Sequence, residues 1–116
     1  RSFIFIDDFC EGIYKSMVKG KVGEIYNFTN KEYISINFLV KKIFSLTSKN
    51  FNKLVKITKD RPTKDYAYKM NPTKAQIKLK WKPKYKLEQG LKKTISWYMA
   101  NKSQLQRLKN IYIHKS

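Results

Sequence analysis

The sequence is short of the residues that build disulfide frameworks and transition-metal centres. Among its 116 residues there is one cysteine, Cys10, and one histidine, His114. A single cysteine excludes an internal disulfide bond, and the two residues together are too few for a zinc site made from protein ligands alone. We therefore expect a protein of a reducing compartment, most simply the cytoplasm.

Long apolar runs are missing as well. The longest runs are only a few residues, whereas a membrane-spanning helix needs about 20. The start of the chain also lacks the charged and then apolar order of a secretory signal, so the sequence predicts no membrane contact. Because the chain opens at Arg1-Ser2-Phe3, without methionine and directly on a strand-like run, we expect it to be a piece of a longer protein.

Arginine is scarce although the chain is strongly basic. The formal net charge is +18, but only Arg1, Arg61 and Arg107 among the 26 basic residues are arginine. Such a charge favours nucleic-acid binding, yet arginine is the residue preferred for forked contacts to phosphate and bases. The 12 isoleucines and 8 asparagines share A/T-rich codons with lysine, so codon bias accounts for the charge better. A small basic nucleic-acid-binding module stays as the alternative.

The apolar periodicity predicts an alternation of strands and helices. Asp7 and Asp8 suit the N-terminus of a helix that ends before Gly20, while Ser35 and Asn71 are typical caps of two later helices. Strands separated by single helices indicate parallel pairing and an α/β fold with an incomplete sheet. The predicted strands are 2–6, 24–28 and 54–58, and the later helices are 36–47, 72–79 and 87–101, followed by a basic tail at 102–116.

Three short motifs have plainer explanations than catalysis or binding. Tyr98 and Lys102 have the Y-x-x-x-K spacing of a proton-transfer pair, but with 8 tyrosines and so many lysines it arises by chance. The pair Gly20 and Gly23 resembles a G-x-x-G nucleic-acid loop, yet a strand rather than a helix is expected to follow. The neighbouring Asp7-Asp8 would face different directions on a helix, which favours helix capping over paired catalysis.

One polar loop combines cations with carboxylates directly after a predicted strand. Asp60-Arg-Pro-Thr-Lys-Asp65 brings Arg61 and Lys64 next to two acidic residues. Ligands of α/β folds bind at the ends of parallel strands, and a guanidinium with an ammonium suits an anionic diphosphate. A solvated ion-pair loop is an equally good interpretation of these residues taken alone.

Six segments between residue 1 and about residue 101 match a known set of motifs in the same order. They are Arg1-Ser-Phe-Ile-Phe-Ile-Asp-Asp8 (R-D-W-[IL]-x-V-x-D), Gly23-Glu-Ile-Tyr-Asn27 (G-E-x-Y-N), Asn37-Phe-Leu-Val40 (N-L-x-V), Asp60-Arg-Pro-Thr-Lys-Asp-Tyr-Ala-Tyr68 (D-R-P-G-H-D-x-R-Y), Leu79-Lys-Trp-Lys-Pro83 (L-G-W-x-P) and Thr94-Ile-Ser-Trp-Tyr-Met-Ala-Asn101 (T-V-x-W-Y-x-x-N). Taken together they resemble the C-terminal third of the nucleotide-sugar 4,6-dehydratases, most closely the dTDP-glucose branch, within the extended short-chain dehydrogenase/reductase superfamily. The D-R-P block is the most distinctive of the six.

The resemblance implies the substrate-binding C-terminal portion, residues 1–101, of an NAD-binding Rossmann-like enzyme. In that family NAD takes hydride from C4 of an NDP-hexose, water leaves across C5–C6, and hydride returns to C6 to give a 4-keto-6-deoxy sugar. The family's NAD loop and catalytic residues precede this segment, so NAD would be bound outside it, in a homodimeric enzyme. By motif position Arg1 and Arg61 would contact the diphosphate and nucleotide, and Asn37 and Lys64 would bind substrate.

Departures from the family pattern leave the substrate open. Thr63 stands for the family glycine and Lys64 for its histidine, while Thr29-Asn30 replace a Gly-Gly pair after the second predicted strand. Glycine permits backbone conformations that these residues disfavour. The specificity for base and sugar therefore stays open between dTDP-glucose, CDP-glucose and GDP-mannose.

Overall fold

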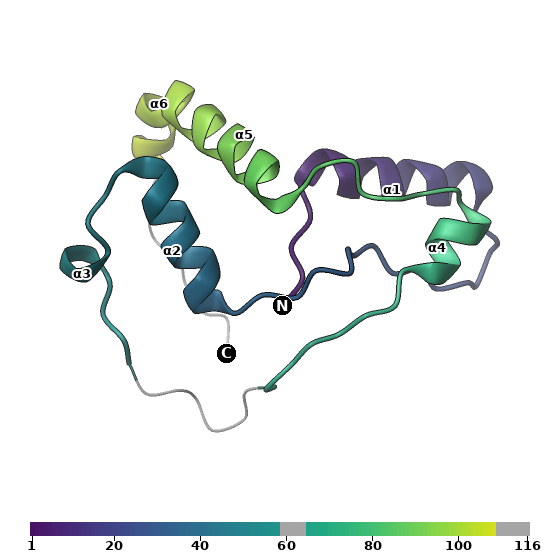
Figure 1. Cartoon of the computed structure of the whole chain (residues 1–116). Coiled ribbons are helices and arrows are strands. Elements are labelled where there is room, and N and C mark those ends of the chain that lie inside the picture. The colour runs from purple at the N-terminus through teal and green to yellow at the C-terminus, as the bar shows by residue number, and fades with distance from the viewer. Residues whose placement is uncertain (59–64, 109–116) are drawn as a thin grey trace, which may run out of the picture.

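A computed structural model describes residues 1–58 and 65–108 (Figure 1). Its helices agree closely with those predicted from apolar periodicity and capping residues. The N-terminal segment leads into α1 and lies against α2 and α5; extended chain joins α1 to α2, and the short helices α3 and α4 lie between α2 and α5 (Figure 1). The helices of the described ranges are α1 (Ile6–Lys19), α2 (Ile36–Thr47), α3 (Phe51–Leu54), α4 (Thr73–Lys78), α5 (Leu87–Ala100) and α6 (Lys102–Gln106).

Capping explains where α2 and α4 begin. The Ser35 side chain accepts a hydrogen bond of 3.0 Å from the backbone N–H of Phe38, which satisfies a donor in the first turn of α2. The Asn71 side chain accepts a bond of 3.0 Å from the Thr73 N–H at the start of α4. The predicted Ser35 cap is confirmed, whereas α4 begins one residue later than predicted, with Pro72 at its N-cap position and Asn71 directly before it.

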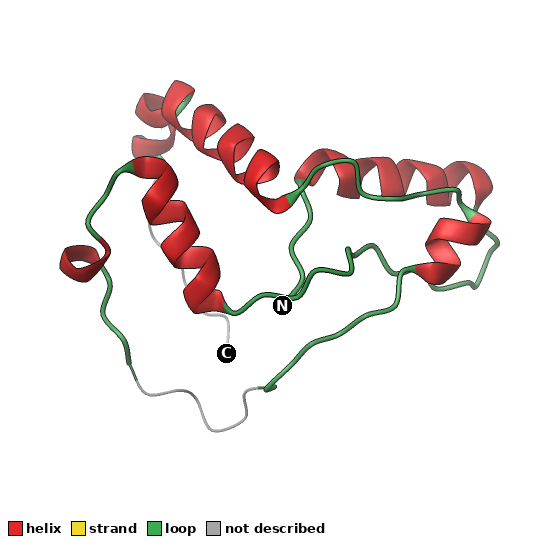
Figure 2. Cartoon of the chain, in the orientation of Figure 1, coloured by secondary structure: helices red, strands yellow, loops and turns green. Residues whose placement is uncertain are grey.

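The predicted strands are not formed within the part of the chain that the structure describes (Figure 2). Residues 2–5 and 24–28 are extended but join no ladder, Ile6 belongs to α1, and Leu54 belongs to α3. The strand prediction is therefore wrong at Ile6 and Leu54. A strand is stable only when its backbone pairs with a neighbour, and 2–5 and 24–28 find no such ladder among the described residues.

A small core holds α1, α4 and the connector before α5 together. Ala75, Leu79 and Trp81 are buried, with Trp81 only 1% exposed. Phe28 packs edge-on against Trp81, with 4.9 Å between the ring centroids, and Ile4 packs on the same cluster. The core therefore joins segments that lie far apart in the sequence.

Asp8 links α1 to the connector and does not cap the helix. It is 1% exposed, and its two carboxylate oxygens accept hydrogen bonds from the backbone N–H groups of Lys84 and Tyr85, at 2.9 and 3.1 Å. Its carbonyl accepts a 2.8 Å bond from the Trp81 indole. The N-cap of α1 is instead Phe5, whose side chain cannot cap. Asp7 and Asp8 lie in the first turn of α1 as predicted, but the prediction that Asp8 caps the helix is wrong.

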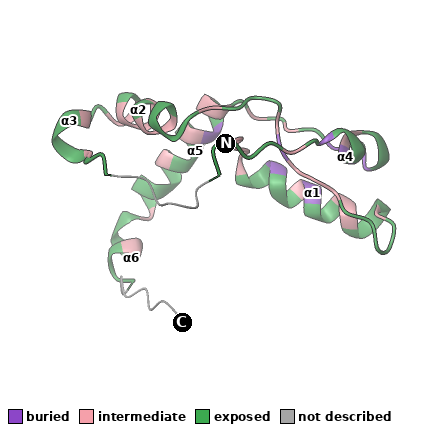
Figure 3. Ribbon diagram, turned by 90° about the horizontal axis from the view of Figure 1, so that it is seen from below, coloured by how far each residue is buried: buried purple, intermediate pink, exposed green. Residues whose placement is uncertain are grey.

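Much apolar surface is left exposed around this core (Figure 3). Met17 on α1 is 80% exposed, and Trp97 on α5 is 58% exposed. The radius of gyration is 17.3 Å, whereas a compact chain of this length has about 13 Å. None of the helices within 1–58 and 65–108 is both long and apolar enough to cross a membrane.

Candidate functional site

A cleft of about 460 Å³ brings together two of the residues that the sequence predicts to bind substrate. Arg1 stands on one wall, Asn37 lies in the first turn of α2, and residues 65–69 close the other side. These three segments are distant in the sequence, so the cleft is a product of the tertiary fold. We call it the Arg1 cleft below.

The backbone of Arg1 is fixed against the segment that leads into α2. The Arg1 nitrogen donates to the Ile34 carbonyl at 2.8 Å, and the Ile34 N–H donates back to the Arg1 carbonyl at 2.9 Å. This mutual exchange is the pattern of directly opposed residues in an antiparallel pair. Because Ser35 and α2 follow Ile34 at once, the exchange sets Arg1 beside the N-terminal end of α2.

The Arg1 guanidinium reaches across the cleft to the opposite wall. Its Nη2 donates to the Asp65 carbonyl at 3.4 Å, and its carbon lies 5.6 Å from the centre of the Tyr68 ring. Within residues 1–58 and 65–108, the guanidinium makes this one long bond and this cation–π contact, which engage only one of its five N–H donors. The cleft thus offers a forked cation beside the positive end of the α2 dipole.

Asn37 is exposed on the first turn of α2, on the side that lines the cleft. Its side-chain amide can both donate and accept hydrogen bonds. The structure therefore brings Arg1 and Asn37 together as the motif positions imply. Arg61 and Lys64, the other two predicted binding residues, lie outside the described residues.

The sequence reasoning missed the aromatic side of this cleft. Tyr33 and Tyr68 line it, and the Tyr33 hydroxyl donates to the Met70 carbonyl at 2.8 Å. The Lys69 ammonium lies 6.0 Å from the centre of the Tyr33 ring and adds a second cation to the lining. Two tyrosines and a lysine directly after Asp65, in Tyr66-Ala-Tyr-Lys69, were the available signal.

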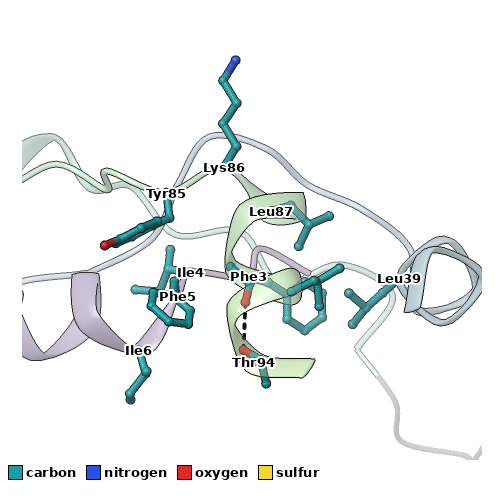
Figure 4. A pocket seen from close by; sticks show the side chains of 11 residues that line it. Phe3, Ile4, Phe5, Ile6, Leu39, Tyr85, Lys86, Leu87 and Thr94 are labelled. Carbon is teal, nitrogen blue, oxygen red and sulfur yellow. Dashed lines mark hydrogen bonds between the residues drawn. The ribbon is translucent and has the colours of Figure 1, made fainter. Parts of the chain in front are cut away.

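A second pocket, of about 260 Å³, is apolar and is not suited to an anion (Figure 4). It lies between the N-terminal segment, α2 and α5, with Phe3, Phe5 and Leu39 on its walls. Two of its lining side chains, Tyr85 and Thr94, carry a hydroxyl; that of Thr94 already donates to the Gly90 carbonyl at 2.9 Å, and Lys86 points away from the pocket. The mostly apolar lining of this pocket contrasts with the charged and aromatic lining of the Arg1 cleft.

Ion pairs outside the cleft tie α2 to α5. Glu88 on α5 accepts from Lys42 on α2 at 2.6 Å and from Lys92 at 2.9 Å. The hydrogen bonds and charges of these two lysines lower the pKa of Glu88 to about 2. Since α2 carries Asn37, this network helps to hold one wall of the cleft.

The isolated motifs take no part in the cleft. Tyr98 lies in α5 and Lys102 begins α6, with Asn101 between the two helices, so they do not share the single helix that the Y-x-x-x-K spacing requires. Gly20 and Gly23 flank a turn closed by the Glu24 N–H and the Lys21 carbonyl at 3.2 Å, and extended chain follows. The plain-turn interpretation is thereby confirmed.

Known proteins with similar sequences align with most of the chain. Residues 1–94 match the GDP-mannose 4,6 dehydratase family. The dTDP-glucose 4,6-dehydratase of Haemophilus influenzae is 33% identical in an alignment of length 114 that covers 89% of this chain and 33% of the relative. The dTDP-D-glucose 4,6-dehydratase of Homo sapiens is 35% identical in an alignment of length 106 that covers 87% of this chain and 30% of the relative.

Solved structures agree with this sequence similarity. The dTDP-glucose 4,6-dehydratase of Bacillus anthracis, in complex with NAD, superposes with a TM-score of 0.78 at 31% identity, over 89% of this chain and 32% of that one. The Bordetella bronchiseptica enzyme WbmF, in complex with NAD⁺ and UDP, gives 0.75 at 28% identity, over 92% and 32%. The fold is thus that of one portion of a Rossmann-like short-chain dehydrogenase/reductase.

The sequence similarity identifies the family within this superfamily. The chain belongs to the NDP-sugar 4,6-dehydratase family of the extended short-chain dehydrogenase/reductase superfamily, as the six motifs predicted. It spans about a third of the length of the curated relatives that it matches.

Proposed function

We propose that this chain is the substrate-binding C-terminal portion of an NAD-dependent dTDP-glucose 4,6-dehydratase, which converts the NDP-hexose to its 4-keto-6-deoxy product. Relatives named dTDP-glucose 4,6-dehydratase support this function, and so does a structural neighbour in complex with UDP. The observation that carries the proposal is that Arg1 and Asn37 line the same cleft.

In this proposal the Arg1 cleft binds the diphosphate of the sugar nucleotide. The guanidinium of Arg1 meets two phosphate oxygens at once, and the positive end of α2 attracts the same charge. Asn37 donates or accepts a hydrogen bond at the rim of the cleft. Arg61 and Lys64 contribute further cations by their motif positions.

The residues of this chain do not fit the pyrophosphate of NAD. A dinucleotide loop needs glycines between a strand and the start of a helix. Here Gly12 and Gly90 lie inside α1 and α5, while Gly20 and Gly23 follow α1. In this proposal NAD, which supplies the hydride chemistry, is bound by residues outside this chain, and the 116 residues bind and orient the substrate.

The same proposal extends to the domain boundaries, the sheet, the oligomeric state and the location of the enzyme. Residues 1–101 form the substrate-binding portion and 102–116 a basic tail. The extended segments 2–5 and 24–28 join parallel strands of a larger sheet in a homodimeric, cytoplasmic enzyme. CDP-glucose and GDP-mannose are the competing substrates.

Titration of the 116-residue chain with dTDP, followed by calorimetry, tests the role of the cleft. A charge-assisted hydrogen bond contributes about 1.5–3 kcal/mol, so Arg1→Ala should raise the Kd about ten- to hundredfold. Arg1→Lys, which keeps the charge but not the fork, should fall between wild type and Arg1→Ala. Lys102→Ala on α6 removes the same charge outside the cleft and should leave the Kd unchanged.

The same titration separates this function from the nucleic-acid alternative. Equal losses of affinity from Arg1→Ala and Lys102→Ala, with binding that falls steeply as salt rises, would indicate a diffuse polyanion surface. Competition by CDP and GDP as effective as dTDP would refute the assignment of the thymidine nucleotide while leaving the diphosphate site intact.

A further inference from the structure

The side chain of Asn30 joins two of the segments that form the Arg1 cleft, the N-terminal segment and the segment that leads into α2. Its Nδ2 donates to the Phe3 carbonyl at 2.6 Å, and its Oδ1 accepts from the Ser2 hydroxyl at 2.8 Å. The same Oδ1 accepts from the Glu32 N–H at 2.8 Å, which bends the chain directly after Asn30. One carboxamide thus makes three hydrogen bonds, two of them across 27 and 28 residues of sequence.

These bonds lie next to the residues that line the cleft. Ser2 follows Arg1 directly, and the Ser2 hydroxyl also donates to the Asn30 carbonyl at 3.2 Å. Four residues after Asn30 comes Ile34, whose backbone exchanges two hydrogen bonds with Arg1. A shift of either segment along the other would therefore break the Asn30 bonds and the Arg1 exchange together.

We propose that Asn30 is a positioning residue of the Arg1 cleft: its carboxamide fixes the segment that carries Arg1 in register with the segment that leads to Asn37. The effect of Asn30 on dTDP binding rests on the proposed function, whereas its effect on the register of the two segments does not.

Hydrogen exchange of single backbone amides tests the register without any ligand. The Ile34 N–H, which donates to Arg1, reports on the register. The Trp81 N–H, which donates to the Ala75 carbonyl, reports on the core. Since each hydrogen bond contributes about 0.5–1.5 kcal/mol, Asn30→Ala should speed exchange at Ile34 about tenfold and leave exchange at Trp81 unchanged.

Further variants identify the atoms involved. Asn30→Asp keeps an acceptor for Ser2 but loses the donor to Phe3, so its effect should be intermediate. Ser2→Ala should cause less change when added to Asn30→Ala than in the wild-type chain, because the bond to the Asn30 side chain is then already lost and only the 3.2 Å bond to the Asn30 carbonyl remains to be removed. The matched control is Asn50→Ala, which removes a carboxamide that accepts from the Lys53 N–H at 3.2 Å, away from the cleft.

Binding of dTDP to the same variants completes the test. Asn30→Ala should raise the Kd about five- to tenfold, and Asn50→Ala should leave it unchanged. Unchanged exchange at Ile34, equal acceleration at Ile34 and Trp81, or an unchanged Kd would each overturn the positioning role. Absence of dTDP binding to the wild-type chain would instead refute the proposed function, and the exchange rates at Ile34 would still decide the register.

Discussion

Replacement of Asp8 should destabilise the fold far more than replacement of its neighbour Asp7. The Asp8 carboxylate is buried and accepts two backbone hydrogen bonds, from Lys84 and Tyr85. Hydrogen bonds to a charged group contribute about 1.5–3 kcal/mol each, and Asp8→Ala also leaves two N–H groups without a partner. We expect a loss of about 3–5 kcal/mol in the free energy of unfolding.

Asp7→Ala is the matched control because it removes the same charge from the same helical turn. Asp7 is exposed and keeps only its interaction with the helix dipole, which contributes about 0.3–1 kcal/mol. Asp8→Asn keeps one acceptor oxygen and places an amide against the other N–H, so it should fall between the two. This variant keeps the test open if Asp8→Ala does not fold.

Urea unfolding followed by tryptophan fluorescence and circular dichroism measures these differences. Trp81 is buried beside Asp8 and donates its indole N–H to the Asp8 carbonyl, so its emission reports the loss of this part of the structure. Equal destabilisation by Asp7→Ala and Asp8→Ala would refute the reasoning. The effect would then come from the charge at the helix N-terminus, not from the two hydrogen bonds.

Two further predictions concern acid stability and activity. Because the pKa of Glu88 is lowered from 4.5 to about 2, its ion pairs stabilise the fold above about pH 4.5, and this stabilisation is lost as the pH falls toward 2. Glu88→Gln should reduce the pH dependence of the urea midpoint in that window, and an unchanged profile would contradict this. The isolated 116-residue chain should not convert dTDP-glucose, as measured by formation of the 4-keto product, and turnover would refute the assignment of NAD binding to residues outside it.

Local sequence signals were sufficient for α1, α2, α4 and α5, but not for the short helices α3 and α6. Ser35 and Asn71 mark two helix starts through hydrogen bonds that span only two or three residues. The apolar spacing along 87–101 defines α5 in the same way. The six ordered motifs also identified the family, since they depend on residue identity and order and not on contacts.

The strands and the function of Asp8 were not accessible to the same reasoning. Residues 2–5 and 24–28 have the composition of strands, but a strand requires a paired neighbour, and the described residues supply no ladder for them. Asp8 follows a predicted strand as a capping residue would, yet its partners lie 76 and 77 residues away. Neither the missing strand pairing nor the distant partners of Asp8 can be predicted from a local sequence pattern.

The sequence by itself thus determined α1, α2, α4, α5 and the family, and it predicted Arg1 and Asn37 as binding residues. Only the tertiary structure decided that these two share a cleft, that Tyr33 and Tyr68 line it, and that Asn30 joins its walls. The physical reason is the range of the interactions. Helix caps and apolar periodicity act within a few residues, whereas the cleft depends on hydrogen bonds between segments that meet only after the chain has folded.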